Sequence, residues 1–373
     1  MPRKKLPDRS TSSSISPLAK FVPEVKRGYP LRGHLSPSTM LEDHIALTES
    51  QNLTSIQSYL LSEESRYPEA NGDFTWVLSA ISLSAKFIAA RCRRARIESV
   101  LGNAGSENVH AESQQKLDVI ANECLLRCLG TRPTVAIVAS EENEEPMIIH
   151  RETDGERPYV VLFDPLDGSS NLDVCGGVGT IFSVLHHDRR AHPIDDSPLQ
   201  PGVNQLAAGY VLYGPSTVLV LTTGNGVQMV VLDPQIGSFL LVEKDIRIPE
   251  KSKNYSLNEA YTSSFPSGYQ EYLAWAHENG YSQRYVGTMV ADVHRILMKG
   301  GVFMYPPTEK APNGKLRLMY EANPMSMLIE QAGGKSSSGL ERTLEIQPHE
   351  LHERTSVILG STWEVEKVQE FLR

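Results

Sequence analysis

The chain has 373 residues, of which 40% are hydrophobic and 22% are charged, as is ordinary for a soluble globular protein. This length exceeds what one compact core usually supports, so we expect two packed domains. The 36 basic and 45 acidic residues give a net charge of −9. That balance argues against nucleic acid or an anionic membrane as a partner, because either would require clustered positive charge.

Residues 1–45 carry Pro, Ser and Arg with little periodicity, and we expect them to form a flexible N-terminal extension. They lack the apolar core of a signal peptide, although their composition would also suit a transit peptide. No apolar run reaches the roughly 20 residues of a membrane span, so the cytoplasm is the expected location. The cysteines have no CxxC pair or zinc-like spacing, which predicts free thiols in a reducing compartment. They are Cys92, Cys124, Cys128 and Cys175.

Two long helices are predicted in the first part of the chain. From Asp73 to about Arg96, apolar residues recur at helical spacing, and the preceding Asn71-Gly72 supplies a start signal. A second apolar stripe predicts a helix from about Ser113 to Leu129, which Gly130 would end.

After the second predicted helix, the hydrophobic pattern changes to short apolar runs. Residues 135–139 and 159–163 show no polar alternation, which predicts strands buried on both faces. Residues 206–242 contain β-rich segments separated by turn residues, which indicates an antiparallel meander. A domain boundary is expected near 243–252, in a charged stretch. Beyond it, helices at 290–299, 324–332 and 364–372 should alternate with strands at 302–305 and 356–359.

Both buried runs end in acidic residues. Glu141 and Glu142 follow the first run, and Asp164 and Asp167 follow the second. Open α/β sheets bind ligands at the carboxyl ends of their strands, so these side chains should share a site. Acids held this close repel one another, and Mg²⁺, which prefers oxygen ligands, would compensate their charge. Two such ions can stabilise both the attacking and the leaving oxygens in phosphoryl transfer.

A turn of small residues, Gly168-Ser169-Ser170, follows directly. Its backbone N–H groups and hydroxyls could approach a phosphate closely. The alternative interpretation is an acidic surface turn with local Asx hydrogen bonds. Two acid clusters behind two buried strands favour metal–phosphate chemistry.

The stretch at 164–171 (DPLDGSSN), followed by GTIF at 179–182, resembles the signature of class I fructose-1,6-bisphosphatases. Segments at 256–261 (SLNEAY), 284–295 (RYVGTMVADVHR) and 313–324 (NGKLRLMYEANP) fit the same family, so the resemblance covers roughly residues 48–373. It implies an α/β fold, the layered αβαβα sugar-phosphatase fold of two subdomains with mixed sheets. It also implies hydrolysis of the 1-phosphate of fructose 1,6-bisphosphate in gluconeogenesis or related carbohydrate metabolism. The expected cofactor is Mg²⁺, two or three ions per subunit, with replacement by Mn²⁺ left open, and the expected assembly is a homotetramer.

On this resemblance, residues 46–245 would form the metal-binding phosphatase domain and residues 246–373 the sugar-phosphate-binding domain. Glu142 with Asp118 would polarise the attacking water, and Glu112 stands where the family usually has Asp. The implied metal ligands are Glu141, Asp164, the backbone carbonyl of Leu166, Asp167 and Glu321. The implied substrate-binding residues are Asp167, Gly168, Ser169, Ser170, Asn258, Tyr261, Arg284, Tyr285, Gly287, Met289, Tyr305, Lys315 and Arg317, of which Arg284 would reach the neighbouring subunit's active site. Asp173 and Asp292 are expected to cap or pair locally.

The sequence departs from the family at a regulatory site. Animal members bind AMP near the start of the first long helix, but here Pro158 and His186 stand where a Lys and an Arg would be expected. Each lost phosphate-pairing cation should cost about 1.5–3 kcal/mol. We therefore expect weak or absent inhibition by AMP.

Other functions remain open from the sequence. Sedoheptulose-1,7-bisphosphatase activity, alone or in addition, would use the same metal and phosphate motifs. An inositol-phosphatase-like enzyme shares the DPLDG motif and its metal chemistry but would not need Arg284, Lys315 and Arg317. A non-catalytic sugar-phosphate sensor should have lost acids from the cluster, and these acids are all present.

Overall fold

The computed structural model describes residues 54–64, 72–98, 100–107, 113–149, 158–188, 191 and 193–373. Residues 52–373 form one compact unit, and the architecture below is that of this unit. The predicted extension at residues 1–45 and the candidate residue Glu112 lie outside the described residues.

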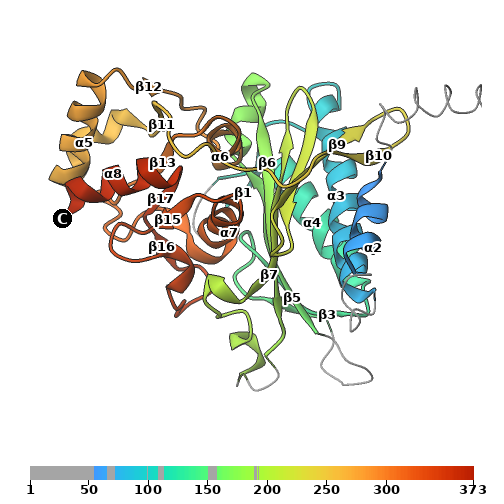
Figure 1. The fold of residues 1–373 in the computed structure, drawn as a ribbon. Coiled ribbons are helices and arrows are strands. Elements are labelled where there is room, and N and C mark those ends of the chain that lie inside the picture. Colours follow the sequence, from blue (N-terminus) through green and yellow to red (C-terminus); the bar gives the residue numbers. More distant parts are fainter. Residues whose placement is uncertain are drawn as a thin grey trace, which may run out of the picture. The chain divides into compact units, whose positions relative to one another are not determined.

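Three helices, α2, α3 and α4, cover one face of the larger sheet (Figure 1). They span Ile56–Glu64, Asp73–Arg94 and Lys116–Gly130. The apolar stripe predicted for α3 is confirmed, since Val77, Ile81 and Ile88 are buried against the sheet. Of the described helices only α3 is long and apolar enough to cross a membrane by length and composition, but half of that stretch is buried inside the unit, as in a core helix.

The start of α4 corrects the sequence prediction. Ser113–Gln115 forms a short strand, β2, that pairs with β1 (Asn103–Glu107), so the helix begins at Lys116 rather than near Ser113. A capping box fixes this start, because the backbone N–H of Gln115 donates to Oδ2 of Asp118 at 2.8 Å.

The larger sheet has eight described strands in the order β10-β9-β8-β7-β6-β5-β3-β4. β3 and β5 run parallel, and their neighbours pair antiparallel, including the predicted meander β7 to β10. The bounds are β3 Val135–Ser140, β4 Met147–Ile148, β5 Tyr159–Asp167, β6 Val178–His186, β7 Gln205–Tyr213, β8 Thr217–Thr222, β9 Val227–Asp233 and β10 Ser238–Glu243. The residues of β3 are all buried, as predicted for a strand covered on both faces.

Helices α6 (Met289–Lys299) and α7 (Asn323–Gln331) cover the other face of this sheet and separate it from a second sheet (Figure 1). The second sheet is mixed and has the order β12-β11-β13-β17-β15. Its strands are β11 Asn254–Ser256, β12 Ser282–Gln283, β13 Val302–Tyr305, β15 Lys335–Ser337 and β17 Val357–Gly360. A two-stranded pair, β14 (Leu316–Arg317) and β16 (Arg354–Thr355), lies apart from it.

Helices α5 (Ser267–Glu278) and α8 (Thr362–Leu372) form the outermost layer on the second sheet (Figure 1). The layers therefore run helix, sheet, helix, sheet, helix. This confirms the expected αβαβα arrangement with mixed sheets.

Candidate active site

The acids that follow β3 and β5 lie at one edge of the larger sheet. The two strands are parallel neighbours, with Ser140 paired to Phe163, so their carboxyl ends coincide. The backbone N–H of Glu141 donates to the carbonyl of Phe163 at 3.0 Å, which holds the first acid beside the second strand.

A bulge in β5 brings Asp164 and Asp167 together. Residues three apart on a regular strand point to opposite faces of the sheet. Here Asp164 pairs with Ile181 and Asp167 with Gly179, so β5 carries one residue more than β6 over this interval. Pro165 lies in the bulge, and its carbonyl accepts a hydrogen bond from Oγ1 of Thr180 at 2.8 Å.

Glu321 comes from the distant part of the chain. It lies in a π-helical turn, Leu318–Ala322, that leads directly into α7. Such turns are rare and often mark functional sites. The backbone N–H of Arg317 donates to Oε2 of Glu321 at 2.6 Å and fixes the carboxylate.

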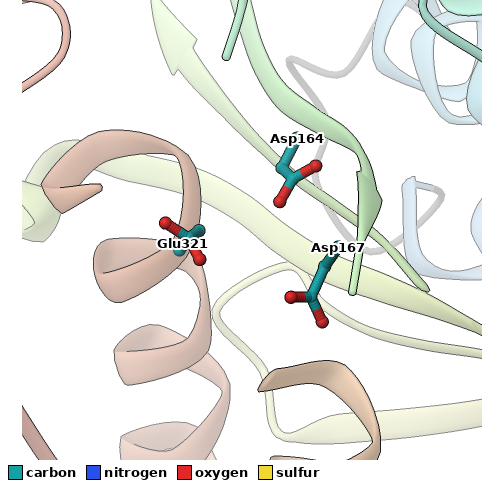
Figure 2. Close-up of side chains that lie close together, drawn as sticks. All are labelled: Asp164, Asp167 and Glu321. Carbon is teal, nitrogen blue, oxygen red and sulfur yellow. The ribbon is translucent and has the colours of Figure 1, made fainter. Parts of the chain in front are cut away.

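Asp164, Asp167 and Glu321 converge on a common space (Figure 2), where one carboxylate oxygen from each lies within 4.8 Å of the others. Burial raises the pKa of Asp164 well above its usual value, and the charges of Glu141, Asp167 and Glu321 raise it further. Burial also raises the pKa of Glu321 to about 8. Without a cation, the cluster therefore holds protons near neutral pH.

An ion pair borders the cluster. Nε of Arg317 donates to Oε1 of Glu141 at 3.0 Å, and both side chains are almost fully enclosed. The guanidinium supplies positive charge to a site otherwise dominated by acids.

Most of the predicted site residues line one cavity of about 320 Å³. They are Glu141, Glu142, Asp164, Leu166, Asp167, Gly168, Ser169, Ser170, Tyr285, Gly287, Met289, Tyr305, Lys315, Arg317 and Glu321. A second cavity of about 490 Å³ is lined by the predicted residues Asn258 and Tyr261 and shares Tyr305 and Lys315 with the first.

Asp118 and Arg284 do not line either cavity. Asp118 is buried in the first turn of α4, and burial raises its pKa to about 7, with the charge of Glu142 adding to the rise. Ser169 is close enough to Asp118 for its hydroxyl to lower that pKa, so Asp118 lies just behind the cavity wall. Arg284 is exposed, and its Nη1 donates to the carbonyl of Gln283 at 2.7 Å.

The sequence interpretation missed Thr288. Its hydroxyl donates to Oδ2 of Asp167 at 2.6 Å, and the N–H of Val290 donates to the same oxygen at 2.8 Å. Gly168 has a φ of +72°, and a Cβ there would lie 2.4 Å from the Cβ of Thr288. Only the position of Thr288, between the predicted Gly287 and Met289, was a signal in the sequence.

Asp292 also lines the cavity, although the sequence suggested only local hydrogen bonding. That interpretation is confirmed, since its carboxylate accepts hydrogen bonds from the N–H groups of Val286 and Gly287. These amides belong to the loop that carries Arg284 and Tyr285. Phe303 and Leu316 complete the unpredicted lining.

An acidic cluster beside a Gly-Ser-Ser turn and two basic side chains, in a layered α/β fold, is typical of metal-dependent phosphoryl-transfer enzymes. The family model described as fructose-1-6-bisphosphatase, N-terminal domain, matches residues 54–244, and the model of the C-terminal domain matches residues 248–373. The class 1 fructose-1,6-bisphosphatase of Chlorobium chlorochromatii (strain CaD3) is 46% identical over 329 residues, which are 86% of this chain and 98% of that protein.

Solved structures of fructose-1,6-bisphosphatase are also similar to this chain. The crystal structure of Leishmania major fructose-1,6-bisphosphatase in holo form matches with a TM-score of 0.81, and the T-state structure with 0.76. Each is 38% identical and covers 85% of this chain and 98% of its own. The chain belongs to the class 1 fructose-1,6-bisphosphatase family, which confirms the family predicted from its sequence.

Proposed function

We propose that this protein hydrolyses the 1-phosphate of fructose 1,6-bisphosphate to give fructose 6-phosphate and inorganic phosphate, in gluconeogenesis or related carbohydrate metabolism. The observation that carries the proposal is the convergence of Asp164, Asp167 and Glu321 next to the Gly168–Ser170 turn. Two adjoining cavities suit a substrate with a phosphate at each end, because each cavity can take one phosphate while the sugar spans them.

In this proposal the reacting phosphate lies against Asp167, Gly168, Ser169 and Ser170, near Arg317. The sugar and its 6-phosphate lie between the two cavities, where Tyr305 and Lys315 line both. The remaining contacts would come from Asn258, Tyr261, Tyr285, Gly287 and Met289. The division into a metal-binding part at 46–245 and a sugar-phosphate-binding part at 246–373 belongs to the same proposal.

The acidic cluster fits Mg²⁺, or Mn²⁺ in its place. Its donors are all oxygens, and their raised pKa values mean that the ionised cluster needs positive charge. Glu141, Asp164, the Leu166 carbonyl, Asp167 and Glu321 would hold two or three ions. When bound, the metal would neutralise charge on the phosphate and lower the pKa of the attacking water.

Glu142 and Asp118 would accept the proton of that water. The pKa of Asp118, raised by burial to about 7, lies near the pH at which a general base works efficiently. Glu112 would complete this group on the basis of the family pattern. Ser169 and Ser170 would orient the phosphate through their hydroxyls.

We further propose a cytoplasmic homotetramer in which Arg284 reaches the 6-phosphate bound by a neighbouring subunit. Its exposure, and its position outside both cavities of its own chain, support such a role. Sedimentation equilibrium of the purified protein tests the assembly. A monomer at micromolar concentration would contradict it.

The function is tested by phosphate release from fructose 1,6-bisphosphate in Mg²⁺ and in EDTA. We expect turnover in Mg²⁺ and none in EDTA. Asp164→Asn should abolish turnover and keep the fold, because it removes charge from the cluster at nearly constant volume. Asp233→Asn, in the remote turn between β9 and β10, is the matched control and should stay active. Turnover in EDTA, or an active Asp164→Asn variant, would contradict the proposal.

A further inference from the structure

The loop of residues 284–288 joins β12 to α6 and carries the substrate-binding residues predicted from the family pattern, Arg284, Tyr285 and Gly287. Its outer surface is exposed at Tyr285 and Val286. Gly287 has a φ of +88°, a backbone conformation that other residues rarely adopt. A turn of this kind keeps one shape only where surrounding groups fix it.

Asp292 is the group beneath this loop. It lies in the first turn of α6 and is 1% exposed. Its Oδ1 accepts the N–H of Val286 at 2.9 Å, and its Oδ2 accepts the N–H of Gly287 at 3.0 Å. Each carboxylate oxygen thus accepts a hydrogen bond from one of two successive backbone N–H groups that precede the helix. An acid in a capping box accepts a backbone N–H at the helix start in a similar way.

The next residues of the loop are held by a different acid. Thr288 Oγ1 and the N–H of Val290 both donate to Oδ2 of Asp167. Asp292 therefore fixes the part of the loop that carries Tyr285 and Gly287, which line the cavity, and Asp167 fixes the part that borders the acidic cluster.

From these contacts we infer that Asp292 is a positioning residue that holds loop 284–288 in the shape that binds the sugar bisphosphate. The inference rests on the proposed function. Without the carboxylate, the substrate would have to order the loop at each binding event, and the entropic cost of that ordering would weaken substrate binding. The ties of Asp167 to Thr288 and Val290 would remain, so the chemical step should be largely preserved.

Asp292→Asn is the principal variant. The two N–H groups meet different carboxylate oxygens, so in asparagine one of them would face an NH2 group, which donates and does not accept. We expect KM for fructose 1,6-bisphosphate to rise roughly tenfold while kcat stays within about threefold of the unsubstituted protein. The matched control is Glu364→Gln, which alters another buried carboxylate that accepts two hydrogen bonds, from Ser252 N and Tyr281 Oη, outside the described cavities. Its KM and kcat should not change.

Amide hydrogen exchange tests whether Asp292 orders the loop, and it requires no measurement of turnover. In the full chain free of substrate, the amides of residues 286 and 287 should exchange roughly tenfold faster in Asp292→Asn than in the unsubstituted protein. If the unsubstituted protein releases no phosphate, the proposed function fails, and the exchange experiment still decides whether Asp292 holds the loop.

A second variant covers the case in which Asp292→Asn does not fold. Val286→Pro removes one of the two donors at an exposed position, with Val286→Ala as the control that keeps the N–H. We expect KM to rise about threefold in the proline variant alone. The inference is overturned if Asp292→Asn or Val286→Pro folds and keeps the KM of the unsubstituted protein, or if kcat falls by as large a factor as KM rises.

Discussion

The substitution Glu321→Gln distinguishes two effects of the acidic cluster, namely the loss of stability that it causes in the metal-free protein and the metal binding that it provides. The change removes a charge at nearly constant volume, and the new amide oxygen can still accept the N–H of Arg317. Burial raises the pKa of Glu321 from 4.5 to about 8, with Asp167 and Glu141 adding to the rise. Ionising such a carboxyl costs the folded state about 5 kcal/mol, at about 1.4 kcal/mol per pKa unit.

The sign follows from proton binding. Because the pKa is higher in the folded protein, that state binds the extra proton between about pH 4.5 and pH 8. Metal-free protein should therefore lose stability as the pH rises through this window. The glutamine variant lacks this titration, so in EDTA at about pH 8.5 it should be more stable by about 5 kcal/mol, with a Tm higher by about 7 °C.

The assay is thermal unfolding of both proteins in EDTA and in Mg²⁺, at about pH 6 and pH 8.5. Metal that binds the folded state at a hundredfold excess over its Kd adds about 3 kcal/mol. The unsubstituted protein should gain this stability and the variant much less, so Mg²⁺ should remove most of the difference. A glutamine variant that is no more stable in EDTA at high pH, or an unsubstituted protein whose metal-free stability rises with pH, would refute the reasoning.

Two further predictions concern the phosphate turn and the start of α3. In Gly168→Ala the new Cβ would be strained by the φ of +72° and would collide with the Cβ of Thr288, so the variant should lose about 2–4 kcal/mol of stability and more than about a hundredfold of kcat/KM. The control is Gly237→Ala, where φ is +64° but the space around the new Cβ is open, and it should stay active. AMP should inhibit turnover less than about twofold at saturating substrate, because Glu64 accepts the N–H and hydroxyl of Thr75 at the N-terminus of α3 and the described residues lining the adjoining cavity include no Lys or Arg. Strong AMP inhibition would contradict this.

The sequence predicted those parts of the fold that follow from local pattern. The all-buried run of β3, the apolar stripe of α3 and the antiparallel meander all lie where periodicity and turn residues indicated. The meeting of Glu141 with the acids of β5 was also predictable, because parallel neighbouring strands end at the same edge of a sheet.

What the sequence could not predict depends on contacts between distant segments. The bulge that turns Asp164 and Asp167 to one side requires the pairing of β5 with β6. The role of Thr288 requires an approach to Asp167 across 121 positions of the chain. The late start of the predicted second helix, at Lys116 instead of Ser113, depends on the pairing of β2 with β1, which competes locally with helix formation. None of these contacts leaves a periodic signal in the residues themselves.

Asp167 has two kinds of partner, and this links the metal cluster to substrate binding. Its Oδ2 accepts two hydrogen bonds from the start of α6, while the same carboxylate faces Asp164 and Glu321. The hydrogen bonds from Thr288 and Val290 oppose the rise that burial causes in its pKa. They favour the ionised form that a metal requires. Asp292 also lies in the first turn of α6 and binds the loop that precedes this helix, so an ordered substrate loop and an ionised Asp167 depend on neighbouring but different groups at the start of one helix. Changes to the start of α6 should consequently alter metal affinity and sugar binding together, whereas changes in Asp292 alone should alter only the second.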